Sequence, residues 1–232
     1  MKLYIKLVVG CALALGCAVS GFAVEVTLEA TKDTFGRSNN RNRNNGGSSA
    51  LLVAHNASAW TIIAFDLSAV TNEIGSAEFQ FRKNNTMAKP ISLVVAPMVQ
   101  TKNNAAWGEG AGNLGAKGQN SKLGEASYAW SSFRDVPWES ASGAALVGLN
   151  DSGLWNAPVA RLDGLPWQEG QWVAVPVVEV SLLETIRQSE FKTATFGLWG
   201  TAGYGLYSIS SKESGSAPKL VLTLKEARGG QK

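Results

Sequence analysis

The stretch WTIIAFDLS, residues 60–68, is an apolar run that ends in turn-forming residues. Side chains of a strand point alternately to opposite faces, so Phe65 and Leu67 are expected in a core, while Asp66 and Ser68 can cap the following turn. Comparable stretches with strand-like patterning recur along the chain at 24–31, 50–55, 76–83, 91–99, 171–178, 194–200, 206–211 and 219–224. This pattern predicts an all-β protein, a two-sheet antiparallel β-sandwich of jelly-roll type.

One segment has a helical period instead. In VSLLETIRQSE, residues 180–190, Leu182, Leu183 and Ile186 share one face. Ser181 followed three residues later by Glu184 matches a capping box. We expect a short crossover helix between strands.

The first 23 residues have the plan of a secretory signal peptide. Lys2 and Lys6 precede an apolar run, and small residues stand before a cleavage point after Ala23. The run is short for a membrane span, and Ala14 stands where an acylation signal at Cys17 would need a bulky apolar residue. The sequence thus predicts an exported protein, secreted or at the cell surface, with no transmembrane segment after cleavage. Residues 24–225 are expected to form one domain, and 226–232 a disordered tail.

Cleavage would remove both cysteines and two lysines. The mature chain of about 210 residues is long enough for a core that needs no disulfides. Its charge is close to neutral, so the composition gives no reason to expect nucleic acid as a partner.

Groups for catalysis are scarce, and we expect a protein that is not an enzyme. His55 is the single histidine, and no Gly-x-Ser-x-Gly elbow accompanies it, so neither a catalytic triad nor a zinc site is indicated. Glu109, Glu125 and Glu139 could act as paired carboxylates in a hydrolase, and a lyase could use Tyr, Arg or Lys. Sequence spacing does not show that any two of these glutamates face each other.

Tryptophan is abundant, with eight residues, and several lie in Gly- and Asn-rich stretches without strand periodicity, at 103–130 and 149–167. Long excursions from a sandwich often carry function, and an exposed indole can stack on a sugar ring. Trp107, Trp155 and Trp167 are therefore candidate carbohydrate-binding residues, although each could also belong to the core. Trp172 and Trp199 lie inside predicted strands and are expected to be buried.

Oxygen ligands for calcium are also available. Acidic residues stand at strand ends and in loops at Asp33, Asp66, Asp135, Asp151, Asp163 and Glu213. Among them, Asp33, Asp66 and Glu213 are the candidate ligands of a structural Ca²⁺. The alternative is that acids in turns accept hydrogen bonds from backbone amides.

The segment RSNNRNRNNGGSS, residues 37–49, is expected to be a loop on the rim of the sandwich. Guanidinium groups bind carboxylates bidentately, which makes Arg37, Arg41 and Arg43 candidates for contact with an acidic polysaccharide such as a polyuronate. A solvated loop without a ligand is the other interpretation.

Several of these stretches resemble one family. KDTFGRS (32–38), WTIIAFDLS with IGSAEFQF (74–81), WGEG (107–110) with YAWSSFRDVPWESASGA (128–144), and the closing YSISSKESGSAPKLVLTL (207–224) resemble DNRLRE-domain proteins, classed as carbohydrate-binding module family ninety-six. The resemblance implies a jelly-roll sandwich that is secreted or on the cell surface. Members often accompany polysaccharide-degrading enzymes or surface proteins, and some are similar to alginate-binding modules. We expect a single domain here, a departure from the family's usual company of other domains, and VAVPVVEV (173–180) lacks the aspartate often found before the crossover helix.

The leading hypothesis is a secreted, non-catalytic carbohydrate-binding module for an acidic polysaccharide such as alginate, with calcium bracing one rim. The alternative is a structural or adhesive protein whose sandwich packs against other extracellular or surface proteins. A polysaccharide lyase or hydrolase is the third possibility.

Overall fold

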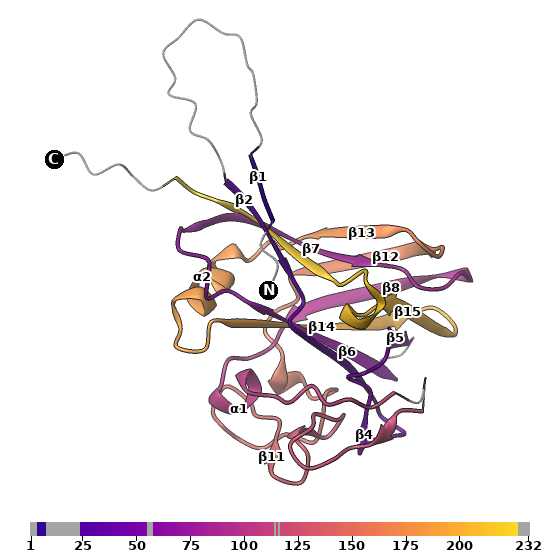
Figure 1. Cartoon of the computed structure of the whole chain (residues 1–232). Coiled ribbons are helices and arrows are strands. Elements are labelled where there is room, and N and C mark those ends of the chain that lie inside the picture. Colours follow the sequence, from indigo (N-terminus) through magenta and orange to yellow (C-terminus); the bar gives the residue numbers. More distant parts are fainter. Residues whose placement is uncertain (1–3, 8–23, 55–57, 114, 116, 227–232) are drawn as a thin grey trace, which may run out of the picture.

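The computed structural model describes residues 4–7, 24–54, 58–113, 115 and 117–226 (Figure 1). The strands are β1 (Tyr4–Leu7), β2 (Val24–Glu29), β3 (Lys32–Arg37), β4 (Arg43–Asn44), β5 (Ala50–Ala54), β6 (Ala59–Asp66), β7 (Ile74–Arg82), β8 (Met87–Pro97), β9 (Gln119–Asn120), β10 (Trp130–Ser132), β11 (Val136–Pro137), β12 (Ala160–Trp167), β13 (Trp172–Pro176), β14 (Thr193–Ala202), β15 (Leu206–Ser210) and β16 (Lys219–Leu224). The α-helices are α1 (Lys102–Ala105) and α2 (Val180–Gln188). Short 3-10 turns occupy Ser152–Leu154 and Lys212–Ser214.

Two five-stranded antiparallel sheets form the body of the protein. Sheet A has the order β1-β2-β16-β7-β13, and sheet B has the order β12-β8-β14-β6-β3. Phe79 of sheet A lies between them, with its ring centroid 6.0 Å from Phe65 and 5.6 Å from Phe196, both on sheet B. The predicted all-β, antiparallel architecture is confirmed, and Phe65 and Leu67 are fully buried as expected.

Strand β6 contributes to two separate cores. Ala59, Ile63 and Phe65 point between the sheets, whereas Trp60, Ile62 and Ala64 belong to a second apolar cluster on the opposite face of sheet B. Every residue of β6 except Asp66 is buried. Such a strand is covered on both faces, so sheet B needs a layer on its outer side as well.

That outer layer is the excursion, defined here as residues 100–158, which runs from the end of β8 to the start of β12. Trp107, Tyr128 and Trp138 from the excursion pack on the outer face of sheet B and are at most 2% exposed. In Figure 1, α1 and β11 lie on the opposite side of β6 from sheet A. The excursion has little regular structure, but it is a packed layer with its own core.

Two strands of sheet B were not predicted. Strand β12 falls in a stretch expected to be irregular, because Gly164, at φ 60°, and Pro166 interrupt its alternation. Its pairing with β8 shifts register on both sides of Leu165. Strand β3 begins with charged and polar residues, and Asp33 and Thr34 are buried in it all the same. Polar residues inside the protein gave no apolar pattern to detect.

The segment 37–49 is exposed at several positions, as expected of a rim loop, but its residues 44–46 are buried. Asn44 is fully buried. Its side-chain amide donates to Glu109 O (2.5 Å) and Ala126 O (2.9 Å). Its Oδ1 accepts from the backbone N–H groups of Gly46 (3.0 Å) and Gly112 (2.8 Å). Four hydrogen bonds from one side chain therefore tie this segment to the excursion.

We predict that Asn44→Ala lowers the free energy of unfolding by about 3 kcal/mol, because it leaves several buried backbone groups without partners. Urea denaturation would measure the change. Asn42→Ala, at an exposed position of the same segment, is the control and should change stability by less than about 0.5 kcal/mol. Equal stability of the two variants would contradict this structural role of the Asn44 side chain.

Helix α2 is confirmed, but its predicted capping box is wrong. The N-cap is Glu179, without a side-chain hydrogen bond, and Ser181 lies inside the helix. Glu184 instead accepts from the backbone N–H of Ile74 (3.2 Å) on β7 and from Arg187 Nε (2.9 Å). Hydrogen bonds from Arg187 hold the pKa of Glu184 down to about 2. With Leu183 and Ile186 buried, this carboxylate fastens the helix to sheet A.

The depressed pKa makes this contact pH-dependent. Because the folded pKa lies below the ordinary value of 4.5, the stabilisation by Glu184 is complete above about pH 5 and is lost as the pH falls towards 2. Glu184→Gln should cost about 1 kcal/mol at neutral pH, a value limited by solvent screening. The difference from the parent should vanish near pH 2 in denaturant titrations, while Glu190→Gln, at an exposed site, should show no difference at either pH. A cost that does not change with pH would contradict this role.

Some predicted features lie outside the described residues. These are most of the signal peptide, both cysteines, His55 and residues 227–232 of the tail. Within the predicted leader, Tyr4–Leu7 form β1, which pairs with β2. No helix in the described part of the chain is long and apolar enough to cross a membrane.

Candidate functional site

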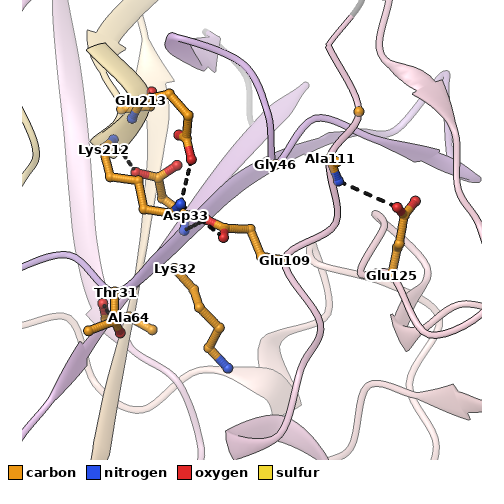
Figure 2. Close-up of polar contacts among 12 residues, drawn as sticks. Thr31, Lys32, Asp33, Gly46, Ala64, Glu109, Ala111, Glu125, Lys212 and Glu213 are labelled. Carbon is orange, nitrogen blue, oxygen red and sulfur yellow. Dashed lines mark hydrogen bonds and ion pairs between the residues drawn. The ribbon is translucent and has the colours of Figure 1, made fainter. Parts of the chain in front are cut away.

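Three carboxylates from distant parts of the chain meet at one place. Asp33 comes from β3, Glu109 from the excursion and Glu213 from the 3-10 turn between β15 and β16, and one oxygen from each lies within 4.8 Å of the others. These three residues are called the acidic cluster. Figure 2 shows their carboxylates converging around the side chain of Lys212.

Backbone geometry fixes the cluster. The N–H of Asp33 donates to Glu109 Oε1 at 2.6 Å, and Asp33 Oδ2 accepts from the N–H of Lys212 at 2.7 Å. Lys212 Nζ lies 3.1 Å from Glu109 Oε2 and also forms an ion pair with Glu213. Asp33 is fully buried, and its second oxygen, Oδ1, has no hydrogen-bond partner.

Burial dominates the electrostatics. It raises the pKa of Asp33 to about 8, against the stabilising hydrogen bond from the Lys212 N–H. Burial also raises the pKa of Glu109. The pKa of Lys32 is lowered by burial, which the nearby charge of Glu109 partly opposes. The amine of Lys32 donates to Trp107 O at 2.8 Å, and in Figure 2 its side chain runs away from the three carboxylates.

The sequence predicted part of this cluster. Asp33 and Glu213 come together as expected for metal ligands, whereas Asp66 does not join them. Asp33 stands opposite Ile63 on β6, so Asp66 lies three residues, or about 10 Å, further along the sheet. Its Oδ1 accepts from the N–H of Ser68 at 2.8 Å, the turn-capping role that was the alternative. Glu109 was proposed only as a catalytic carboxylate, since nothing in the sequence indicates where the excursion places it.

Two of the tryptophans predicted to bind carbohydrate are buried in the structure. Trp107 and Trp167 are each 1% exposed. The indole N–H of Trp107 donates to Thr195 Oγ1 at 3.2 Å, and that of Trp167 to Asn85 Oδ1 at 2.8 Å. Neither ring presents a face on which a sugar could stack, so the prediction of exposed rings is wrong for both.

Trp155 is half-buried and already stacked. Its ring centroid lies 5.6 Å from that of Trp60 and 5.5 Å from that of Trp199, and its N–H donates to Leu149 O at 2.8 Å. It also lies against Gly197, where an added Cβ would come within 2.4 Å of the indole. The inner face of the ring therefore belongs to the second core.

The predicted arginines are engaged with the protein itself. Arg41 donates to Val147 O, and its guanidinium lies 5.6 Å from the centroid of the Tyr128 ring. Arg43 Nη1 donates to Gly118 O at 3.4 Å, and Arg37 is half-buried at the end of β3. The contacts of Arg41 and Arg43 anchor segment 37–49 to the excursion, and ligand binding by the three arginines stays a prediction.

Sequence reasoning missed the aromatic side chains that are exposed. Among the described residues these are Trp172, 44% exposed, and Tyr204, 69% exposed. Trp172 was expected in the core, but it stands at the start of the edge strand β13 and faces outwards. Lys219 Nζ lies 5.0 Å from the Trp172 ring centroid, and Lys89 Nζ lies 5.1 Å from that of Tyr204.

These residues occupy one end of the sandwich, called here the aromatic end. The β12–β13 turn, the start of β8 and the β14–β15 loop meet there (Figure 1). Asn85 joins them: its Oδ1 accepts from Trp167 Nε1 and from Ser208 N (2.9 Å), and its Nδ2 donates to Leu206 O (3.1 Å). The hydroxyl of Tyr207 donates to Lys89 O at 2.8 Å. These hydrogen bonds join the β7–β8 turn, β8, β12 and β15 at this end of the sandwich.

No protein-family model matches the chain, and a search of the curated proteins found no match.

Proposed function

We propose that this protein is an exported, non-catalytic carbohydrate-binding module of jelly-roll type whose ligand is an acidic polysaccharide such as alginate. The observation that carries the proposal is the aromatic end, where Trp172 stands exposed beside Lys219. The resemblance of the sequence to DNRLRE-domain proteins supports the same function, and membership of that family is part of the proposal.

The chemistry of the aromatic end suits a sugar acid. An indole offers an apolar plate for the C–H face of a pyranose ring, and stacking needs only that part of the ring is exposed. Arg82 pairs directly across from Trp172 on β7, and Lys219 reaches the ring from β16. The guanidinium of Arg82 donates to Gly170 O (3.3 Å) and to Ser216 Oγ (3.4 Å), which holds it beside the ring. A carboxylate on a bound sugar would gain charge-assisted hydrogen bonds from such cations, which are stronger than those to the hydroxyls of a neutral glycan.

Two of the three glutamates considered for a hydrolase are hydrogen-bonded within the excursion. Glu125 accepts hydrogen bonds from Lys122 N (2.8 Å) and Ala111 N (3.4 Å) within the excursion. Glu139 accepts one from the side chain of Asn103. Neither of these two glutamates belongs to the acidic cluster that contains Glu109.

Affinity electrophoresis of the mature chain in gels that contain alginate or a neutral β-glucan tests the proposal. We expect retardation by alginate. Trp172→Ala should weaken binding about tenfold, or about 1.4 kcal/mol, and Lys219→Gln should weaken it less. Val178→Ala and Lys102→Gln remove an exposed apolar and an exposed basic side chain away from this surface, so both controls should bind like the parent.

Each other outcome has a definite meaning. Retardation that survives Trp172→Ala would place the binding site elsewhere on the protein. Absence of retardation in every gel would favour the structural or adhesive protein that packs against other surface proteins. Soluble products released from the polysaccharide would establish a lyase or hydrolase.

A further inference from the structure

We propose that the acidic cluster of Asp33, Glu109 and Glu213 binds a divalent, oxygen-seeking cation, with Ca²⁺ as the preferred ion. The proposal is independent of carbohydrate binding, because the cluster and the aromatic end share no residue.

The unsatisfied oxygen of Asp33 supports a cation at this place. This side chain is fully buried, and the structure gives its Oδ2 a backbone donor but its Oδ1 none. A buried carboxylate oxygen without a partner costs about 1–3 kcal/mol or more, so such groups call for an explanation. In Figure 2 the carboxylate of Asp33 lies beside that of Glu213, which leaves Oδ1 inside the cluster.

The charge of the cluster also favours a cation. Three carboxylates share the single ammonium group of Lys212, which contacts Glu109 and Glu213. Lys32, the other nearby cation, directs its amine at the carbonyl oxygens of Ala105 and Trp107. Metal ions bind carboxylates in the ionised form and displace their protons. With all three acids ionised in the bound state, the cluster would carry two negative charges beyond the one that Lys212 balances, which match the charge of one divalent ion.

The donor atoms of the cluster and its exposure to solvent suit such an ion. The site offers only oxygen donors and no thiolate or imidazole, a set that favours Ca²⁺ or Mg²⁺ over zinc or copper. Three carboxylates supply part of a calcium shell, and water can complete it. The side chains of Glu213 and Lys212 are 27% and 28% exposed, so an ion has a path from solvent.

Binding would have a structural consequence. The three ligands belong to β3, to the excursion and to the turn before β16, which are far apart in the chain. One ion would therefore clamp the excursion to the sandwich, and it would stabilise the folded protein because an unfolded chain does not present this arrangement.

Isothermal titration of the chelator-stripped chain with CaCl₂, together with thermal unfolding, tests the proposal. We expect one ion per chain with a dissociation constant on the order of 10⁻⁴–10⁻³ M, and weaker binding of MgCl₂. At about 10 mM CaCl₂ the midpoint temperature should rise by roughly 5 °C. Asp33→Asn and Glu213→Gln should each weaken binding at least about tenfold, whereas Asp163→Asn, at an exposed acid on β12, should leave it unchanged.

Glu213→Gln keeps the test decisive if Asp33→Asn does not fold, because Glu213 lies at the exposed side of the cluster. A parent protein with neither binding heat nor a shift in midpoint temperature would overturn the proposal. Binding that persists in Glu213→Gln and is lost in Asp163→Asn would also overturn it, because the ion would then lie elsewhere.

Discussion

The apolar character of both faces of sheet B is the constraint on which the rest of the structure depends. The strand β6 places Ile63 and Phe65 between the sheets and Trp60 and Ile62 on the other side, so the outer face has to be covered too. The excursion covers it with large rings such as Trp138, which is fully buried. A long segment with little regular structure is thus held by packing, and its large rings Trp107, Tyr128 and Trp138 belong to a second core.

The alternation of apolar and polar residues determined how much of the fold could be predicted from the sequence. Period-2 patterning located the strands on both sides of the main core, and the helical period located α2. Period-2 patterning failed for β12, where Gly164 and Pro166 break the alternation. Neither period could place the excursion, because its residues follow no regular pattern. Trp172 shows a related limit, because alternation assigns a residue to a face of a strand without saying whether that face is covered.

The candidate sites, like the fold, could be predicted only in part. Asp33 and Glu213 stand at ends of strands, where acidic ligands are expected, and they do meet. Glu109 joins them only because the excursion folds back over sheet B, with Asn44 accepting and donating along its path. Asp66 was predicted as a ligand because it stands next to a turn, but its carboxylate accepts a hydrogen bond from the Ser68 N–H within that turn. Contacts between segments that are distant in the chain are set by tertiary packing, which short motifs do not encode.

The structure thereby separates three uses of aromatic and acidic residues. Trp107, Trp138 and Trp155 of the excursion pack into a core, the acidic cluster joins three chain segments, and the rings of Trp172 and Tyr204 at the aromatic end are exposed. A titration of the ¹⁵N-labelled protein with alginate oligosaccharides, followed through the indole N–H signals of its eight tryptophans, tests this separation most directly. The account predicts that the Trp172 signal shifts with ligand concentration while those of Trp107 and Trp167 stay in place. Shifts at Trp107 and Trp167 with none at Trp172 would contradict it.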